Sequence, residues 1–166
     1  MSILRASGLG AAPNEGMRMR YSEGTLGRVF VLRLEDGDPL NTTVETFARE
    51  HGIGRGVAFY VGGGAGGTSL VVGPDATRTD AVVPLFHALT APNETFAFGT
   101  LFPNDAGEPV LHMHAACGRE GGATVGCTRA GLETWLIGEI VLVEIIGTEA
   151  ARRLDPVSGF ELLELP

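Results

Sequence analysis

The chain has 166 residues and a formal net charge of -8, and all twelve of its cationic residues are arginine. The acidic charge argues against binding to a nucleic-acid backbone, and the absence of lysine excludes Schiff-base chemistry and a P-loop. Because the length suits one domain, and because the chain has only two cysteines and no long apolar span, we expect a cytoplasmic protein without membrane segments or disulfides.

The N-terminal part of the chain divides into an arm and a first strand. Residues 1–17 show no periodicity, so we expect a loose arm ahead of a single domain at residues 18–166. Residues 28–34 alternate between apolar and polar and are rich in β formers, which predicts a strand that ends in the turn at residues 35–39.

One helix is predicted after this turn. Thr42 and Glu45 have the spacing of a capping box, and Gly52 supplies the stop. The apolar face of the helix consists of Leu40, Val44, Phe47 and Ala48.

The rest of the chain predicts strands joined by short loops. These strands are 56–61, 68–73, 81–89, 93–102, a hairpin within 109–127, 131–138, 139–147 and 160–165, the last of which would close the sheet. Residues 62–67 contain G-x-G-x-x-G, but a strand follows instead of a helix, so we interpret them as a bend and not as a nucleotide site. Short loops leave no room for crossover helices, which predicts an α+β fold with a mainly antiparallel sheet and one or two helices.

The strongest functional signal is the pair His112 and His114 in the apolar segment at residues 109–117. Residues two apart lie on the same face of a strand. If Cys117 pairs with Thr124 across the glycine-rich turn, His114 lies opposite Cys127, and the three side chains converge. Imidazole and thiolate are zinc ligands, and three protein ligands leave one position open. The alternative is that the histidines are ordinary polar residues of a strand.

A zinc-dependent enzyme would need a proton carrier and a group that orients an anionic substrate. Candidate carboxylates are Glu133 and Glu94, and candidate arginines are Arg129 and Arg119. The alternative for all four is solvent-facing charge. The activity of such an enzyme would be lyase-like or hydrolytic, on a small anionic substrate.

Two further residues have structural interpretations. We expect His87 to be a hydrogen-bonded histidine at a strand end. Trp135 is expected in the core or in a subunit interface. The 44% hydrophobic content and the mean hydropathy of +0.18 favour self-association.

Four parts of the chain carry a resemblance to a known family. They are V-L-R-L-E-D-G-D-P-L with F-A-R-E-H-G-I, the bend at residues 61–67, G-T-L-F-P-N-D-A-G-E-P-V-L-H-M-H, and G-E-I-V-L-V-E-I with L-D-P-V-S-G-F-E-L-L. Over residues 28–165 the chain resembles the PPC family, the plants and prokaryotes conserved domain of unknown function. The resemblance implies an antiparallel-sheet domain, similar in fold to acetolactate decarboxylase, that assembles as a homotrimer.

The resemblance also implies a zinc-type metal, bound in bacterial and archaeal members by an H-x-H pair and the histidine of a G-G-H segment. His112 and His114 match the pair, whereas Cys127 stands in place of the third histidine with a spacing one residue shorter. Many relatives are named "putative DNA-binding protein", but the AT-hook core R-G-R-P is absent, so direct DNA binding is not expected. We therefore predict a zinc-binding protein that binds or acts on a small oxygenated metabolite. The alternative is a non-catalytic oligomeric interaction module.

Overall fold

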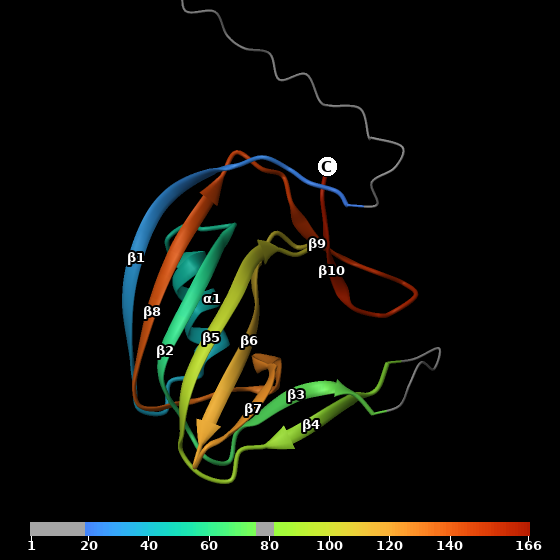
Figure 1. Ribbon diagram of the computed structural model, residues 1–166. Helices are drawn as coiled ribbons and strands as arrows, with labels where there is room; N and C mark the ends of the chain where they lie inside the picture. The colour runs from blue at the N-terminus through green and yellow to red at the C-terminus, as the bar shows by residue number, and fades with distance from the viewer. Residues whose placement is uncertain (1–18, 76–81) are drawn as a thin grey trace, which may run out of the picture.

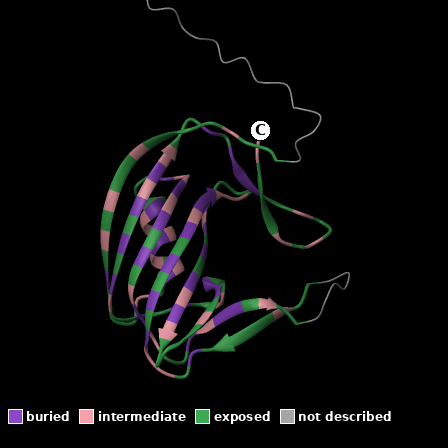
Figure 2. Cartoon of the chain, viewed as in Figure 1, coloured by how far each residue is buried: buried purple, intermediate pink, exposed green. Residues whose placement is uncertain are grey.

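Buried and exposed side chains alternate along the central strands, and this alternation gives the main sheet one buried and one exposed face (Figure 2). The computed structural model describes residues 19–75 and 82–166, so the expected arm at residues 1–17 lies outside the described residues. Eight antiparallel strands form the sheet in the order β1-β8-β2-β5-β6-β7-β3-β4, and helix α1 covers one face (Figure 1). The predicted α+β class is confirmed.

The strands of the main sheet are close to the predicted ones. They are β1 Thr25–Glu35, β2 Gly56–Gly64, β3 Ser69–Pro74, β4 Pro84–Ala88, β5 Asn93–Pro103, β6 Pro109–Arg119, β7 Gly122–Cys127 and β8 Thr134–Ile146. A short 3-10 helix, η1 (Thr128–Ala130), follows β7. Strand β4 begins at proline and lies at the sheet edge, where the missing N–H of proline is tolerated.

Helix α1 (Leu40–Glu50) buries the predicted apolar face against the sheet. Its capping differs from the prediction, because the helix begins at Leu40 with Pro39 as N-cap and no side-chain cap. The capping-box residue Glu45 instead accepts a hydrogen bond from the backbone N–H of Leu111 in β6, at 2.8 Å. No helix in the described part of the chain is long and apolar enough to cross a membrane.

The prediction of two strands at 131–138 and 139–147 is wrong, because β8 runs through both segments. Gly138 does not make a turn. A Cβ atom there would lie 2.7 Å from the hydroxyl oxygen of Tyr60, so the glycine provides room for this buried ring. The irregularity comes earlier, where Leu136 has a φ of 64° and the register with β2 shifts.

The first glycines of the segment at residues 62–67 bring two backbones close together. Cβ atoms at Gly62 and Gly63 would clash with the carbonyl oxygens of Ile137 and Trp135 in β8. Only glycine fits this close approach. Strand β3 follows the bend, so no helix N-terminus is available there for a nucleotide phosphate.

The C-terminal strand does not close the main sheet. Strand β10 (Glu161–Glu164) pairs with a strand absent from the prediction, β9 (Ala151–Leu154), in a separate two-stranded sheet (Figure 1). Asp105, in the β5–β6 turn, holds this hairpin through an ion pair with Arg153 at 3.3 Å and a hydrogen bond from the N–H of Leu154 at 3.4 Å. The hairpin therefore lies beside the end of β5 and the start of β6.

Candidate metal centre

The predicted register of the histidine hairpin is confirmed. Cys117 pairs with Thr124 across β6 and β7, and His114 pairs with Cys127. His112 and His114 lie on the exposed face of the sheet, whereas Cys117 faces the core and is 2% exposed. Both cysteines are free thiols.

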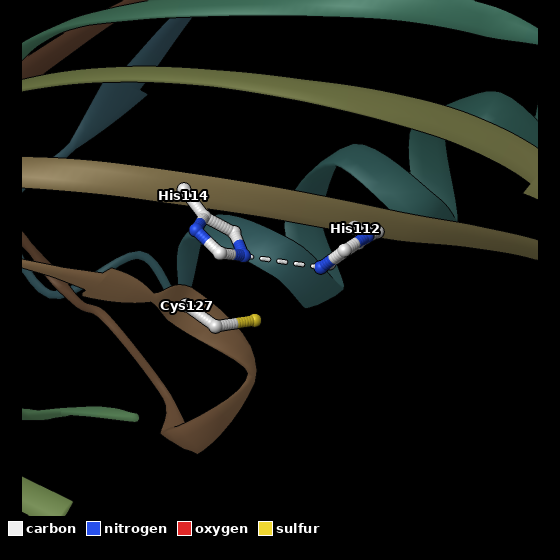
Figure 3. Close-up of side chains that lie close together, drawn as sticks. All are labelled: His112, His114 and Cys127. Carbon is white, nitrogen blue, oxygen red and sulfur yellow. Dashed lines mark hydrogen bonds between the residues drawn. The ribbon is translucent and has the colours of Figure 1, made fainter. Parts of the chain in front are cut away.

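The three candidate ligands converge on one point (Figure 3). The Nε2 atoms of His112 and His114 lie 3.2 Å apart, and with the sulfur of Cys127 the ligand atoms all lie within 4.8 Å of one another. Two nitrogens and one sulfur around a tetrahedral zinc ion are roughly 3.3 to 3.7 Å apart, given the usual bond lengths. The nitrogen–nitrogen distance equally suits a hydrogen bond between two neutral imidazoles.

Helix α1 fixes the backbone next to His112. Leu111 is in the part of β6 that extends past its pairing with β7. Its N–H donates to the Glu45 carboxylate and its C=O accepts from the Asn41 amide at 3.1 Å. Two helix side chains thus replace the missing strand partner and set the position from which His112 projects.

Helix η1 fixes Cys127 in a similar way. Thr128, the next residue, is completely buried, and its hydroxyl donates to the carbonyl oxygen of Met113 at 3.2 Å. Cys127 also pairs with Val71 of β3 and is only 4% exposed. The backbone that carries Cys127 is therefore fixed by both neighbouring strands and by η1.

Two pockets meet at His112. One has a volume of about 340 Å³ and contains all three candidate ligands. The other has a volume of about 500 Å³ and extends toward the β9–β10 hairpin. Arg129 and Phe160 line both pockets together with His112, and the Arg129 guanidinium carbon lies 4.9 Å from the centre of the Phe160 ring.

The surroundings of His112 favour its neutral form. Burial lowers the pKa of His112, and the charges of Arg152, His114 and Arg129 lower it further. A neutral imidazole is the form that binds a metal ion. The site therefore presents His112 in its metal-binding state.

Arg152 is the residue that sequence reasoning missed. It is on β9, is 5% exposed, and donates from Nη2 to the hydroxyl and carbonyl oxygens of Thr100 at 3.1 and 3.4 Å. Thr100 is directly opposite His112 in the β5–β6 pairing. The turn residues D-P-V-S-G before F-E-L-L were a signal for a hairpin, and this hairpin would have placed a strand at Arg152.

The other predicted site residues lie elsewhere. Glu94 and Arg119 line a separate pocket of about 620 Å³ with Trp135, which is 42% exposed and so is not a core residue. Glu133 is exposed, and its backbone forms an isolated antiparallel β-bridge with Pro39. Neither glutamate lines a pocket that contains His112, and their catalytic role stays a prediction.

His87 also lies apart from the candidate ligands. It is exposed, lies within β4 and pairs with Leu70. It lines neither of the two pockets that contain His112.

Comparisons with known proteins agree with this architecture. The family model of the Plants and Prokaryotes Conserved (PCC) domain matches residues 21–146. A metal-containing protein from Archaeoglobus fulgidus is similar in structure, with a TM-score of 0.74 and 24% identity over 88% of this chain and 99% of that one. A plant- and prokaryote-conserved protein from Pyrococcus horikoshii has a TM-score of 0.69 and 22% identity over 89% and 100% of the two chains.

A third solved structure carries a different name. The "putative DNA-binding protein" from Ralstonia eutropha has a TM-score of 0.62 and 19% identity over 82% of this chain and 90% of that one. A comparison with curated proteins finds no match. At these identities the solved structures establish the fold, while the chemistry has to be argued from the residues described above.

Proposed function

The chain belongs to the Plants and Prokaryotes Conserved (PCC) family, and from this premise we propose that it binds a zinc-type metal ion through His112, His114 and Cys127. The observation that carries the proposal is the convergence of their ligand atoms within 4.8 Å. The metal-containing relative from Archaeoglobus fulgidus lends support at the level of the fold.

The donor set favours zinc over harder cations. Two imidazoles and a thiolate are soft to borderline ligands, whereas magnesium and calcium prefer oxygen. Three protein ligands would leave one coordination position open. A zinc ion held by these three residues would supply Lewis-acid activation of a carbonyl group or of water, which is the chemistry of the predicted lyase-like or hydrolytic activity.

The chain's own residues suit a small oxygenated, anionic ligand. Arg129 lines the pocket that contains the three candidate ligands and has the donor fork that recognises a carboxylate. We assign it the role of orienting the ligand. Glu94 and Glu133 have no assigned contact with it, because neither lines this pocket.

Elemental analysis of tag-free protein purified without chelator tests the metal. We expect about one zinc per chain in the wild type and a loss in both His114→Ala and Cys127→Ala. His87→Ala and Cys117→Ala are matched controls, since they remove the same groups outside the site and should keep the zinc. Background metal in the wild type would overturn the proposal.

A second candidate function, an oligomeric interaction module, is favoured by the exposed face of the sheet. One register row across this face joins Val31, Val141, Phe59 and Phe98 to His114 and Cys127. Val31 is 80% exposed and Phe98 is 46% exposed. Side chains of this kind across a sheet are typical of an interface.

We propose that other copies of the chain cover this face in the expected homotrimer. Sedimentation equilibrium should give a trimer for the wild type and a smaller species for Phe96→Glu, which changes a 56%-exposed residue of the face. Val157→Glu, outside the main sheet, should remain trimeric. A monomeric wild type would contradict the proposed homotrimer. Retention of the wild type on a DNA column would contradict the expectation of no DNA binding.

A further inference from the structure

We infer that Arg152 and Arg129 form a binding site for a small oxyanion, a carboxylate or a phosphate, beside His112. The inference rests on the proposed function in one respect, because the ligand's second contact would be the metal in the adjoining pocket. It also names the class of ligand, which the candidate metal ligands alone leave open.

Arg152 is a buried cation that forms no direct ion pair among the described residues, although Glu161 of the same pocket acts on its charge from a longer distance. It is 5% exposed, and no carboxylate lies within 4.0 Å of its nitrogens. Its Nη2 contacts Thr100, while its Nε is buried and has no hydrogen-bond partner in the described structure. Burying an unpaired guanidinium is costly, so its retention here indicates that an anion supplies the missing charge.

Arg129 supplies a second set of donors in the pocket that also contains His112 and Arg152. It comes from η1, after β7, and its guanidinium lies over the ring of Phe160 from the β9–β10 hairpin. Stacking on a ring leaves the in-plane N–H groups of a guanidinium free. These groups are the ones that bind a carboxylate or phosphate through two parallel hydrogen bonds.

Both arginines line the same pocket of about 500 Å³, which also contains His112. Glu161 is the one acidic residue lining it, so the charged lining is net positive in a chain of formal charge -8. A pocket of this volume suits a small molecule. The contrast with the acidic chain favours a small anion over a nucleic acid, which needs an extended basic surface.

His112 connects this anion site to the metal site, because it lines both pockets. A ligand with its charged end on the arginines therefore has a path to the open coordination position. A carboxylate with a neighbouring keto or hydroxyl oxygen offers one group to each site. Inorganic phosphate can occupy the arginines alone.

Calorimetric titration of zinc-loaded protein with pyruvate and, separately, with inorganic phosphate tests the inference. We expect saturable binding to the wild type. In Arg129→Gln and in Arg152→Lys the affinity for the anion should be lower by a factor of about ten or more. Arg129 is exposed, and lysine keeps the buried charge, so both variants should fold. Arg49→Gln is the matched control, since Arg49 lies on α1, pairs with Glu108 and should leave anion binding unchanged.

The outcomes separate the two proposals. Tighter binding of pyruvate than of phosphate assigns the site to carboxylates, and the reverse assigns it to phosphates. A protein that holds zinc but binds neither anion, or binds equally well in all variants, overturns the anion site alone. A protein that lacks zinc but binds an anion in an arginine-dependent way supports the anion site and overturns the metal.

Discussion

Arg152 donates a hydrogen bond to the hydroxyl group of Thr100, the residue directly opposite His112 in the β5–β6 pairing. The contact joins a C-terminal hairpin to the centre of the sheet. It places a guanidinium from β9 next to an imidazole from β6, although the two residues are far apart in the sequence. Thr100 is therefore a positioning residue for the proposed anion site.

Removing this hydroxyl should disturb anion binding without disturbing the metal. In Thr100→Val the shape is nearly kept, but Arg152 loses one acceptor and is held less firmly. We expect anion affinity to fall a few-fold, in line with about 1 kcal/mol for one hydrogen bond, while zinc content stays unchanged. Calorimetry and elemental analysis on the same sample measure both, and Thr124→Val on β7 is the control. Loss of zinc in Thr100→Val would contradict a role limited to Arg152.

The contact between α1 and β6 should contribute to stability through Glu45. Glu45→Ala leaves the N–H of Leu111 without its acceptor and should destabilise the fold by about 1–3 kcal/mol. Glu45→Gln keeps an acceptor oxygen. Because burial raises the pKa of Glu45, the charged form is disfavoured in the folded state, and the glutamine variant should be at least as stable as the wild type at pH 7. Urea unfolding of both variants provides the comparison, and equal effects would refute this explanation.

Glu144 should make stability depend on acid pH. Two side-chain hydrogen bonds from Arg28, at 2.8 Å each, and one from its backbone N–H hold the pKa of Glu144 at about 2. A folded pKa below the unfolded value of about 4 stabilises the fold above that value, and the stabilisation is lost as the pH falls toward 2.

Glu144→Gln removes this dependence. We expect it to lower the free energy of unfolding by roughly 1 kcal/mol at pH 7, a modest amount because Arg28 is half exposed. Urea unfolding of the wild type and the variant between pH 7 and pH 3 should show their difference shrinking with acidification. A difference that does not change with pH would show that the pair contributes no linked protonation.

More of the candidate metal centre than of the proposed anion site could be predicted from the sequence, for a physical reason. The two-residue period of a strand places His112 and His114 on one face, and a short glycine turn fixes Cys127 opposite His114. Arg152 depends instead on a four-residue strand that pairs only with the C-terminus and packs against β5 through tertiary contacts. The local sequence pattern therefore predicts the arrangement of His112, His114 and Cys127 but not the position of Arg152.

The same contrast between local pattern and tertiary contact explains the errors in the predicted fold. The apolar face of α1 follows from its period, but its N-terminus does not, because Glu45 bonds to β6 in place of the cap. Gly138 in β8 resembles a turn residue in sequence, yet it provides room for Tyr60 across the sheet. In both cases a tertiary contact replaced the local preference.

Replacing the thiolate with a third imidazole gives the most direct test of the ligand set. Cys127→His would present three imidazoles, a donor set that also binds zinc, so we expect metal content to be retained. In cobalt-loaded protein the wild type should show a near-ultraviolet thiolate-to-cobalt charge-transfer band, which requires a bound sulfur. The band should disappear in Cys127→His and persist in Cys117→Ala, whose thiol faces the core. A band that persists in Cys127→His would assign the sulfur ligand to another residue, and loss of metal in that variant would show that this position accepts only the shorter cysteine side chain.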